Sequence, residues 1–224
     1  MGRNMIGGQR HEHGFVAGTL VHTGTGLVPI ERVRAGDRVL SPVDASGLHA
    51  YRQVLDTFRF EPRQVHLIRF YTAQAHAAAK LAGATIPRED FHAVVVTGDQ
   101  LFRVTRLGWT RAADLEHHNE FVLADGRAAF VSSVDKVYRT VTDDVGWVQG
   151  RGGRDDEEGR LLDLRGGRIL YGARRVFNKG VDWWEGDQWL QMPVHQLEVE
   201  DSPCWYAGAL GVCVRAEEMT GTKQ

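Results

Sequence analysis

The chain has 224 residues, of which 42% are hydrophobic and 25% are charged, and its formal net charge is −2. This composition is that of an ordinary globular protein and excludes the disordered and fibrous classes. The near-neutral net charge lacks the excess of positive charge that is typical of proteins that bind nucleic acid or an anionic membrane. No apolar run approaches the roughly 20 residues of a membrane span, and the start of the chain lacks the apolar centre of a signal peptide. We therefore expect a cytoplasmic protein with one large domain, no nucleic-acid or membrane partner and no cofactor.

The first 13 residues are expected to form a polar lead-in. His11 and His13 could suggest a metal site, but they lack the neighbouring carboxylates or thiols that such a site needs. We therefore predict exposed histidine side chains and no metal.

The stretch from Phe15 to Ser41 reads FVAGTLVHTGTGLVPIERVRAGDRVLS. Apolar residues recur through it between closely spaced glycines, a pattern typical of short strands joined by tight turns. Two further strands are predicted over 51–60 and 65–71. The Ala-rich residues 73–83 predict a short helix that ends at Gly83, ahead of Pro87.

A second segment, beginning at Val94, repeats the opening one. One constant offset superimposes turn glycine and apolar positions of the two copies, aligning Leu20 with Phe102, Thr23 with Thr105, Gly26 with Gly108, Val33 with Leu115, Asp37 with Asn119 and Val39 with Phe121. An internal β repeat predicts two similar halves related by a pseudo-twofold axis.

Residues 142–192 fit this pattern poorly and are expected to form an insertion. Residues 150–167 are rich in Arg, Gly and acidic residues without any period, which favours an exposed loop. Beyond them lie three tryptophans, Trp183, Trp184 and Trp189. They either belong to a small core of the insertion packed on the main domain, or form a face that binds a partner protein.

The chain closes with a predicted hairpin over 194–214, in which His195, Leu197 and Val199 alternate with polar residues. Cys204 and Cys213 flank its turn at Gly208–Gly211. A disulfide between them is geometrically possible, but two cysteines in a cytoplasmic protein favour free thiols.

These motifs resemble those of the Hint domain, the fold shared by inteins, hedgehog autoprocessing domains and the pre-toxin processing domains of bacterial polymorphic toxins. That family opens with Cys-Phe-x-x-Gly-Thr, Ile-Glu-x-Ile and Gly-Asp-x-Val; the counterparts are Gly14 to Thr19, Ile30 to Val33 and Gly36 to Val39. The resemblance implies an all-β, Hint-like horseshoe with a pseudo-twofold repeat. Its core would comprise residues 14–141 and 193–216, with 142–192 inserted and 217–224 as a tail.

Hint domains cut or splice their own backbone. The resemblance implies a cysteine that attacks the preceding carbonyl, a Thr-x-x-His motif that polarises the same peptide bond, and a closing His-Asn pair. For each of these three functions, this chain lacks at least one of the residues that the family uses. The matching positions hold Gly14 for the nucleophile, Thr97 and Gln100 for Thr-x-x-His, Gln196 for the penultimate-strand Asn or Asp, Pro203 for the hairpin His, and Arg215 and Ala216 for the closing pair.

The sequence therefore predicts a catalytically degenerate Hint domain that acts by binding another protein, in a bacterial toxin-processing or immunity setting. Its partner would be a toxin, a flanking polypeptide or a processing target. The alternative is self-cleavage or splicing by a non-standard route. A third option, a repurposed hydrolase, would use His22, Thr97 or Cys204, while Cys213 is expected to be a small apolar core residue.

Overall fold

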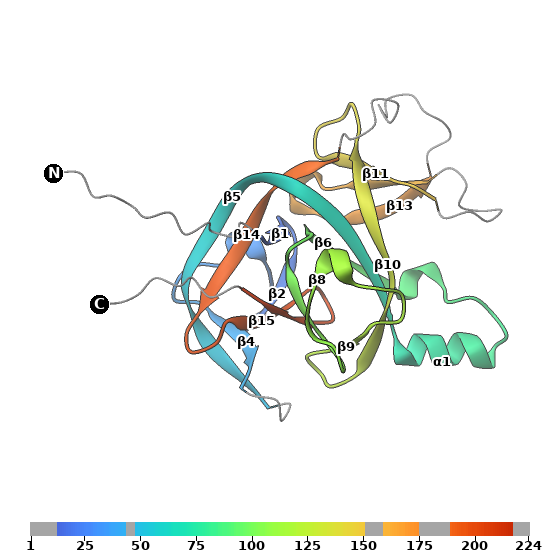
Figure 1. Cartoon of the computed structure of the whole chain (residues 1–224). Helices are drawn as coiled ribbons and strands as arrows, with labels where there is room; N and C mark the ends of the chain where they lie inside the picture. Colours follow the sequence, from blue (N-terminus) through green and yellow to red (C-terminus); the bar gives the residue numbers. More distant parts are fainter. Residues whose placement is uncertain (1–12, 44–47, 151–158, 175–188, 217–224) are drawn as a thin grey trace.

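The computed structural model describes residues 13–43, 48–150, 159–174 and 189–216. Its strands join into one 16-stranded sheet that curves back on itself, and α1 (Ala73–Leu81) projects from one side (Figure 1). The predicted all-β class is confirmed. No helix within these ranges is long and apolar enough to cross a membrane.

The strands fall into three groups along the chain. The first contains β1 (Phe15–Val16), β2 (Leu20–Thr23), β3 (Gly26–Pro29), the 3-10 turn η1 (Ile30–Arg32), β4 (Arg38–Pro42) and β5 (His49–Thr72). The second contains η2 (Arg88–Asp90), β6 (Phe91–Thr97), β7 (Leu101–Val104), β8 (Gly108–Arg111), η3 (Ala112–Asp114), β9 (Glu120–Val122) and β10 (Ala128–Arg139). The third contains β11 (Val145–Val148), β12 (Arg160–Asp163), η4 (Arg165–Gly167), β13 (Leu170–Arg174), β14 (Gln191–Val199), β15 (Cys204–Ala207) and β16 (Val212–Arg215).

The repeat predicted from the sequence is present as two copies of one strand pattern. In each copy a hairpin leads through a 3-10 turn to a third strand: β2–β3–η1–β4, then β7–β8–η3–β9. The turn before the third strand is closed in both copies by one side-chain oxygen. Asp37 Oδ2 accepts from the backbone N–H of Arg34, and Asn119 Oδ1 accepts from that of Glu116, both at 2.8 Å.

The closing hairpin lies between the two copies. Strand β15 pairs with β2 through Ala207 and Val21, and β16 pairs with β7 through Val214 and Phe102. The hairpin therefore bridges equivalent strands of the two halves, as a pseudo-twofold arrangement requires.

Strand β5 is the long central strand of the sheet and pairs with β4, β6, β10 and β14. The two strands predicted for 51–60 and 65–71 are one continuous strand, because β14 pairs alongside it from Val199 to Gln191 across the intervening polar residues (Figure 1). Its two faces serve different cores. Ile68 and Phe70 pack into the main core, whereas Val65 and Leu67 pack into a second one.

The expected helix over 73–83 is confirmed as α1. The Thr72 hydroxyl accepts a hydrogen bond from the N–H of Ala75 at 3.1 Å, which caps the first turn. Beyond the helix, Gly83 adopts φ +59°, a left-handed conformation that glycine adopts without steric cost. Only Ala79 of the helix is buried, so α1 lies on the surface.

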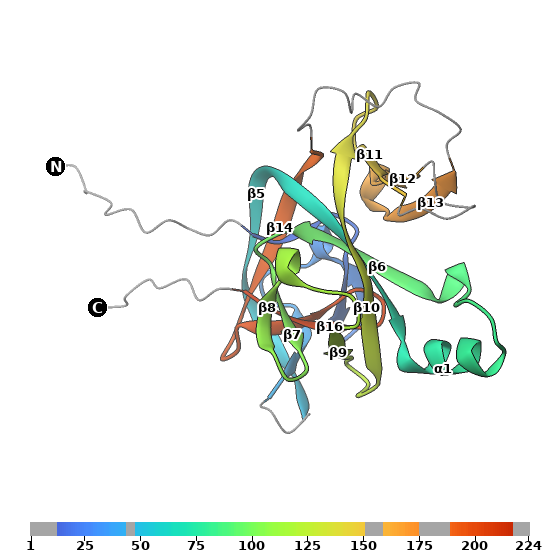
Figure 2. The ribbon, with the colours of Figure 1, turned by 45° about the vertical axis from the view of Figure 1, so that its right-hand side comes forward.

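The segment expected as an insertion continues the sheet beyond β10. Strands β11, β12 and β13 add to it in order, and they lie above β6 in the view of Figure 2. The exposed loop predicted over 150–167 is wrong for Arg160 to Leu164, where β12 forms and Arg160, Leu162 and Leu164 are buried. The alternation of buried and partly exposed residues in this short strand was not apparent from the sequence, because it lies in a charge-rich stretch and one of its buried residues is Arg160. Residues 151–158 lie outside the described residues.

The second core joins this segment to the main domain. Leu162, Leu164 and Val148 from the segment pack with Val65, Leu67, Val95 and Val194 of the central strands. Because one apolar cluster spans both parts, the segment is held to the sheet by burial as well as by backbone pairing.

The burial of Leu162 gives a direct test of strand β12. Leu162→Ala removes a fully buried side chain and should lower the free energy of unfolding by about 2–4 kcal/mol. The matched control Leu170→Ala changes a side chain that is 54% exposed and should change it by less than about 0.5 kcal/mol. Equal small effects in urea unfolding would show that residues 160–164 are not packed.

Candidate functional site

The start of β1 and the end of β6 are bound together at the position that matches the family nucleophile. The N–H of Gly14 donates to Thr97 Oγ1 at 3.0 Å, and the N–H of Thr97 donates to the Gly14 carbonyl at 3.0 Å. Both residues are buried, and the neighbouring Phe15 pairs with Val96 and with His195. The peptide bond before Gly14 is therefore fixed beside the Thr97 hydroxyl.

Gly14 has no side chain, and the fold has no room for one. A Cβ atom placed on Gly14 would overlap the carbonyl oxygen of His195 and would lie 2.9 Å from its carbonyl carbon. The obstacle is backbone of the paired strand β14, which cannot turn aside as a side chain can. A nucleophilic side chain at this position would require β1 and β14 to separate.

The interior behind Gly14 is filled by a hydrogen-bonded pair of amides. Gln196 Nε2 donates to Gln100 Oε1 at 3.0 Å, and Trp205 Nε1 donates to Gln196 Oε1 at 3.2 Å. Gln100 Nε2 donates in turn to the carbonyls of Arg215 and Leu101, at 2.9 and 3.1 Å. Both N–H groups of the Gln100 amide and one N–H group of the Gln196 amide are used within the protein, so the Gln100 side chain is satisfied without a ligand.

The positions matching the closing residues lie at the same place. Arg215 is tied to Gln100 through its carbonyl, and the N–H of Ala216 donates to the carbonyl of Pro203 at 2.8 Å. The structure thus brings all the matching positions into one connected cluster: Gly14, Thr97, Gln100, Gln196, Pro203, Arg215 and Ala216. None of these seven carries a thiol, an imidazole or a carboxylate.

Cys204 lies on the other face of β15 from this cluster. Trp205 points into the main core, while Cys204, Tyr206 and Cys213 form a separate cluster with Leu40 and Trp109. Both thiols are free and buried. A hydrogen bond between them lowers the pKa of Cys204 and raises that of Cys213. A Cys204 thiolate would thus form on the side of the strand away from Gly14.

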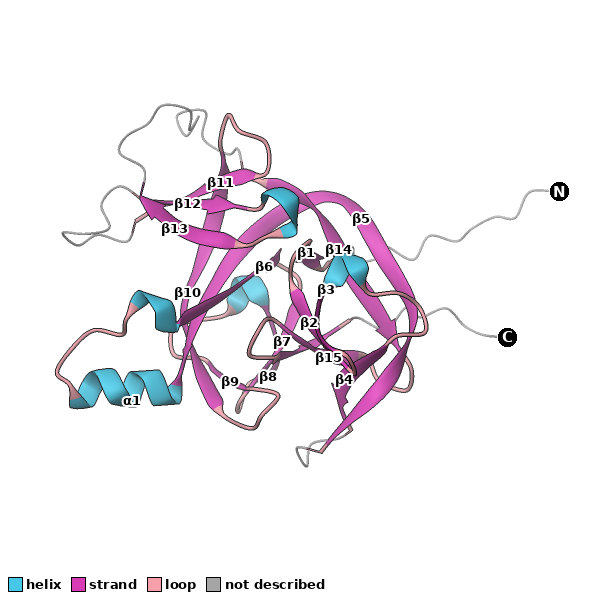
Figure 3. Cartoon of the chain, turned by 180° about the vertical axis from the view of Figure 1, so that it is seen from behind, coloured by secondary structure: helices cyan, strands magenta, loops and turns pink. Residues whose placement is uncertain are grey.

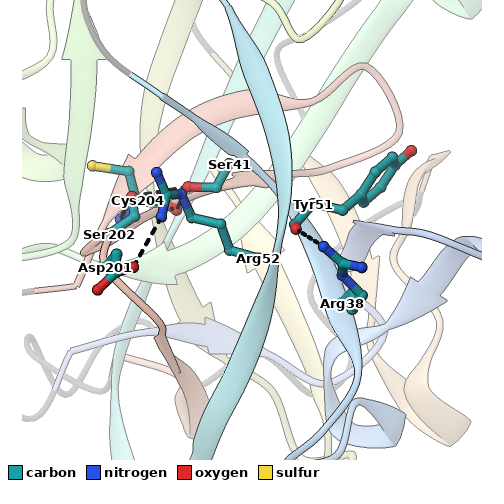
Figure 4. Close-up of polar contacts among 7 residues, drawn as sticks. All are labelled: Arg38, Ser41, Tyr51, Arg52, Asp201, Ser202 and Cys204. Atoms are coloured by element: carbon teal, nitrogen blue, oxygen red, sulfur yellow. Dashed lines mark hydrogen bonds and ion pairs between the residues drawn. The ribbon is translucent and has the colours of Figure 1, made fainter.

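The turn that carries Pro203 is anchored by hydroxyl groups. Ser41 Oγ lies 2.8 Å from Ser202 Oγ and 2.7 Å from the carbonyl of Cys204, and Arg52 pairs with Asp201 at 3.6 Å (Figure 4). These contacts hold the start of β15 against β4 and β5 and fix the approach of the turn to the site.

Two histidines considered from the sequence, His22 and His13, differ in where they lie relative to the site. His22 is held at the hairpin turn by the Gly208 carbonyl, 3.0 Å from its Nε2, and does not contact Thr97. His13 was expected to be exposed, yet it is 4% exposed, because the residues entering β1 are enclosed with the strand. His11 lies outside the described residues.

His66 is the imidazole that the sequence did not point to. It stacks edge-on against Trp189 and borders Gly98, and its buried Nδ1 has no hydrogen-bond partner among the described residues. Burial lowers the pKa of His66, and the nearby Lys136 lowers it further, against an opposing effect of Asp99. It lines an open hollow of about 400 Å³ beside Thr97, outside the amide network.

Of the three tryptophans considered for binding, Trp189 is described. Its ring already contacts His66, and the Lys136 ammonium lies 4.2 Å from the ring centre. Trp183 and Trp184 lie outside the described residues. No group of three or more His, Cys, Asp or Glu residues that could hold a metal occurs in the part of the chain that the structure describes.

Comparison with solved structures identifies the fold. The chain is similar to a bacterial intein-like domain from Clostridium thermocellum, with a TM-score of 0.53 and 19% identity over 91% of this chain and 98% of that one. It is also similar to a DnaB intein from Synechocystis sp. PCC 6803, with a TM-score of 0.53 and 10% identity over 92% and 100% of the two chains. The gp41-1 intein matches with a TM-score of 0.51 and 13% identity over 91% and 98%.

No protein-family model matches the sequence, and no curated protein matches it significantly. The structural likeness establishes that this chain has the Hint fold of inteins, as its motifs predicted. At these identities the likeness concerns the fold, and the chemistry must be argued from the residues of this chain.

The close approach at Gly14 can be measured. Gly14→Ala adds the Cβ that meets the His195 carbonyl and should lower the free energy of unfolding by about 1–3 kcal/mol. Gly24→Ala is the matched control, since its Cβ would meet no atom closer than 4.0 Å, and should change it by less than about 0.5 kcal/mol. Equal stability of the two variants in urea would contradict the enclosure of Gly14.

The buried His66 should make stability depend on pH. Because its pKa is lowered in the folded state, the unfolded chain binds the proton more readily below about pH 6.5, and stability should fall as pH decreases from there. His66→Gln should flatten this decline in denaturant titrations between about pH 7 and 5, leaving a residual slope from His92 and His195, whose pKa values burial also lowers. An unchanged slope in the His66 variant would refute this account.

Proposed function

We propose that this protein is a Hint-fold domain that neither cuts nor splices its own backbone and that acts by binding another protein. The observation that carries the proposal is the enclosed position of Gly14. A splicing centre needs a side-chain nucleophile at this point, and here the His195 carbonyl occupies the space that its Cβ would need.

The amide network supports the same conclusion. A general acid or base must change its protonation state near neutral pH, and a glutamine amide cannot. Gln100 stands in the position of the family histidine, and its side chain is committed to Gln196, Arg215 and Leu101. The residues at this site hold the strands together instead of moving protons.

The partner suggested by the resemblance is a toxin, a flanking polypeptide or a processing target, in a bacterial toxin-processing or immunity setting. A Hint scaffold of this kind would keep the shape of a processing domain and lack its cutting step. Binding, rather than turnover, is then the property on which the protein's role depends.

A reporter fusion tests the loss of chemistry. The whole chain, with a reporter protein at each end, should keep one intact mass through prolonged incubation with and without added thiol. A splicing-competent intein between the same reporters is the positive control. Release of a reporter by cleavage beside Gly14 or Ala216, identified by mass, would overturn the proposal.

Restoring two family residues sharpens this test. Gly14→Cys with Gln100→His returns a thiol and an imidazole to the matching positions. We expect a less stable protein without cleavage, because the new Cys side chain overlaps the His195 backbone and the imidazole breaks the amide network. Thiol-dependent cleavage by this variant would show that the site opens more easily than the enclosure implies.

One observation favours the alternative, self-cleavage by a non-standard route. The Thr97 hydroxyl still contacts the amide of the peptide bond before Gly14, as a residue that polarises this bond would. In the same fusion, cleavage that disappears in Thr97→Val would establish this route, whereas an intact wild-type fusion excludes it.

A further inference from the structure

A large cleft in the described part of the molecule lies away from the cluster around Gly14. It has a volume of about 870 Å³, and its lining includes residues of β6 in the main domain and of β13 in the segment beyond β10. Figure 3 shows these two strands, with β13 above β6. The two walls come close at Gly18, where an added Cβ would overlap the carbonyl group of Gly167. Nothing in the site described above accounts for this space.

Both walls present the edges of strands. Five consecutive residues, 168–172, line the cleft on one side, and four consecutive residues, 91–94, line it on the other. Successive side chains of a strand point to opposite faces, so an unbroken run of lining residues means that the cleft runs along the backbone edge.

Each of these edges has unpaired length. Strand β13 pairs with β12 on one side and has no other partner strand among the described residues. Strand β6 pairs with β5 along its whole length, but among the described residues its other side is paired only at the end near Gly14 and β1, through Val96 and Thr97. An edge of this kind offers backbone N–H and C=O groups to an added extended chain.

The charge of the cleft is one-sided. Its lining residues include four arginines and no aspartate or glutamate: Arg69, Arg88, Arg160 and Arg168. Two acids close to the lining are engaged, since Asp135 pairs with Arg69 at 3.2 Å and Glu31 accepts a hydrogen bond from the N–H of Gly18, while Glu89 and Asp90 lie between Arg88 and Phe91 along the chain but do not line the cleft. Arg88 and Arg168 are exposed at the surface of the cleft.

The apolar part of the lining limits what the ligand can be. Phe91, Ile169, Leu170 and Tyr171 lie beside the arginines. A small inorganic anion would use the guanidinium groups and leave this surface uncovered, whereas an extended peptide with alternating acidic and apolar side chains would use both.

We propose that the cleft between β6 and β13 binds an extended acidic peptide of a partner protein, which pairs with a strand edge and places its carboxylates against the arginines. This inference deepens the proposed binding function by naming a surface and a class of partner. It can fail while the absence of self-cleavage holds, because the reporter fusion measures cleavage and the experiment below measures binding.

The test is fluorescence anisotropy with a labelled peptide in which glutamate alternates with valine and threonine. The full-length protein should bind this peptide, and binding should weaken as salt is raised. A peptide with glutamine in place of glutamate, and one with alternate backbone nitrogens methylated, should both bind more weakly, because one lacks the charges and the other lacks N–H donors for the strand edge.

Charge-reversal variants locate the site. Arg88→Glu with Arg168→Glu should weaken binding on the order of tenfold, while the control Arg59→Glu, an exposed arginine on β5 outside the cleft, should bind like the wild type. Circular dichroism should confirm that these surface variants stay folded. No binding of the acidic peptide, equal weakening in both variants, or full displacement of the peptide by equimolar inorganic phosphate would overturn the proposal.

Discussion

The close approach of two backbones, Gly14 on β1 and His195 on β14, is the constraint on which the site depends. The pairing of Phe15 with His195 brings the strands to this distance, and Phe15 in turn packs edge-on against Trp205 at 5.2 Å between ring centres. Only a residue without a Cβ fits in front of the His195 carbonyl. The geometry that best packs this end of the core is therefore the geometry that excludes a nucleophile.

The glutamine pair follows from that closure. A polar group sealed in the core must have its hydrogen bonds satisfied, and Gln100 makes three with its side chain: it donates to two carbonyls and accepts from Gln196. An imidazole has two ring nitrogens and could replace at most two of these bonds. A glutamine at position 100 therefore satisfies more hydrogen bonds of the buried network than an imidazole would. Because these residues share one network, the effects of changing them should not be additive.

Much of the fold follows from the sequence, and the reasons are local. The two-copy pattern could be predicted because its elements recur at one constant offset along the chain. These elements are the turn glycines, the spacing of the apolar residues, and the residues Asp37 and Asn119 that close the turns. Strand β12 could not, because it alternates Arg160 and Leu162 inside a charge-rich stretch and its burial depends on packing from distant strands. The burial of His13 and the involvement of His66 also escaped prediction, since both depend on which strands become neighbours. The sequence alone identified the residues at the site, but it did not indicate that they are buried.

Strand β6 relates the closed site to the open cleft. Its last residue, Thr97, contacts Gly14, while Phe91 to Val94 form a wall of the cleft at its other end. Val94, Val95 and Val96 between them are buried, and their pairing with β5 fixes the register of both ends. The Gln100 amide donates both of its N–H groups to backbone carbonyls, whereas the outer edge of β6 has unpaired length among the described residues. The position that matches the family nucleophile and the proposed peptide-binding edge therefore lie at opposite ends of one strand.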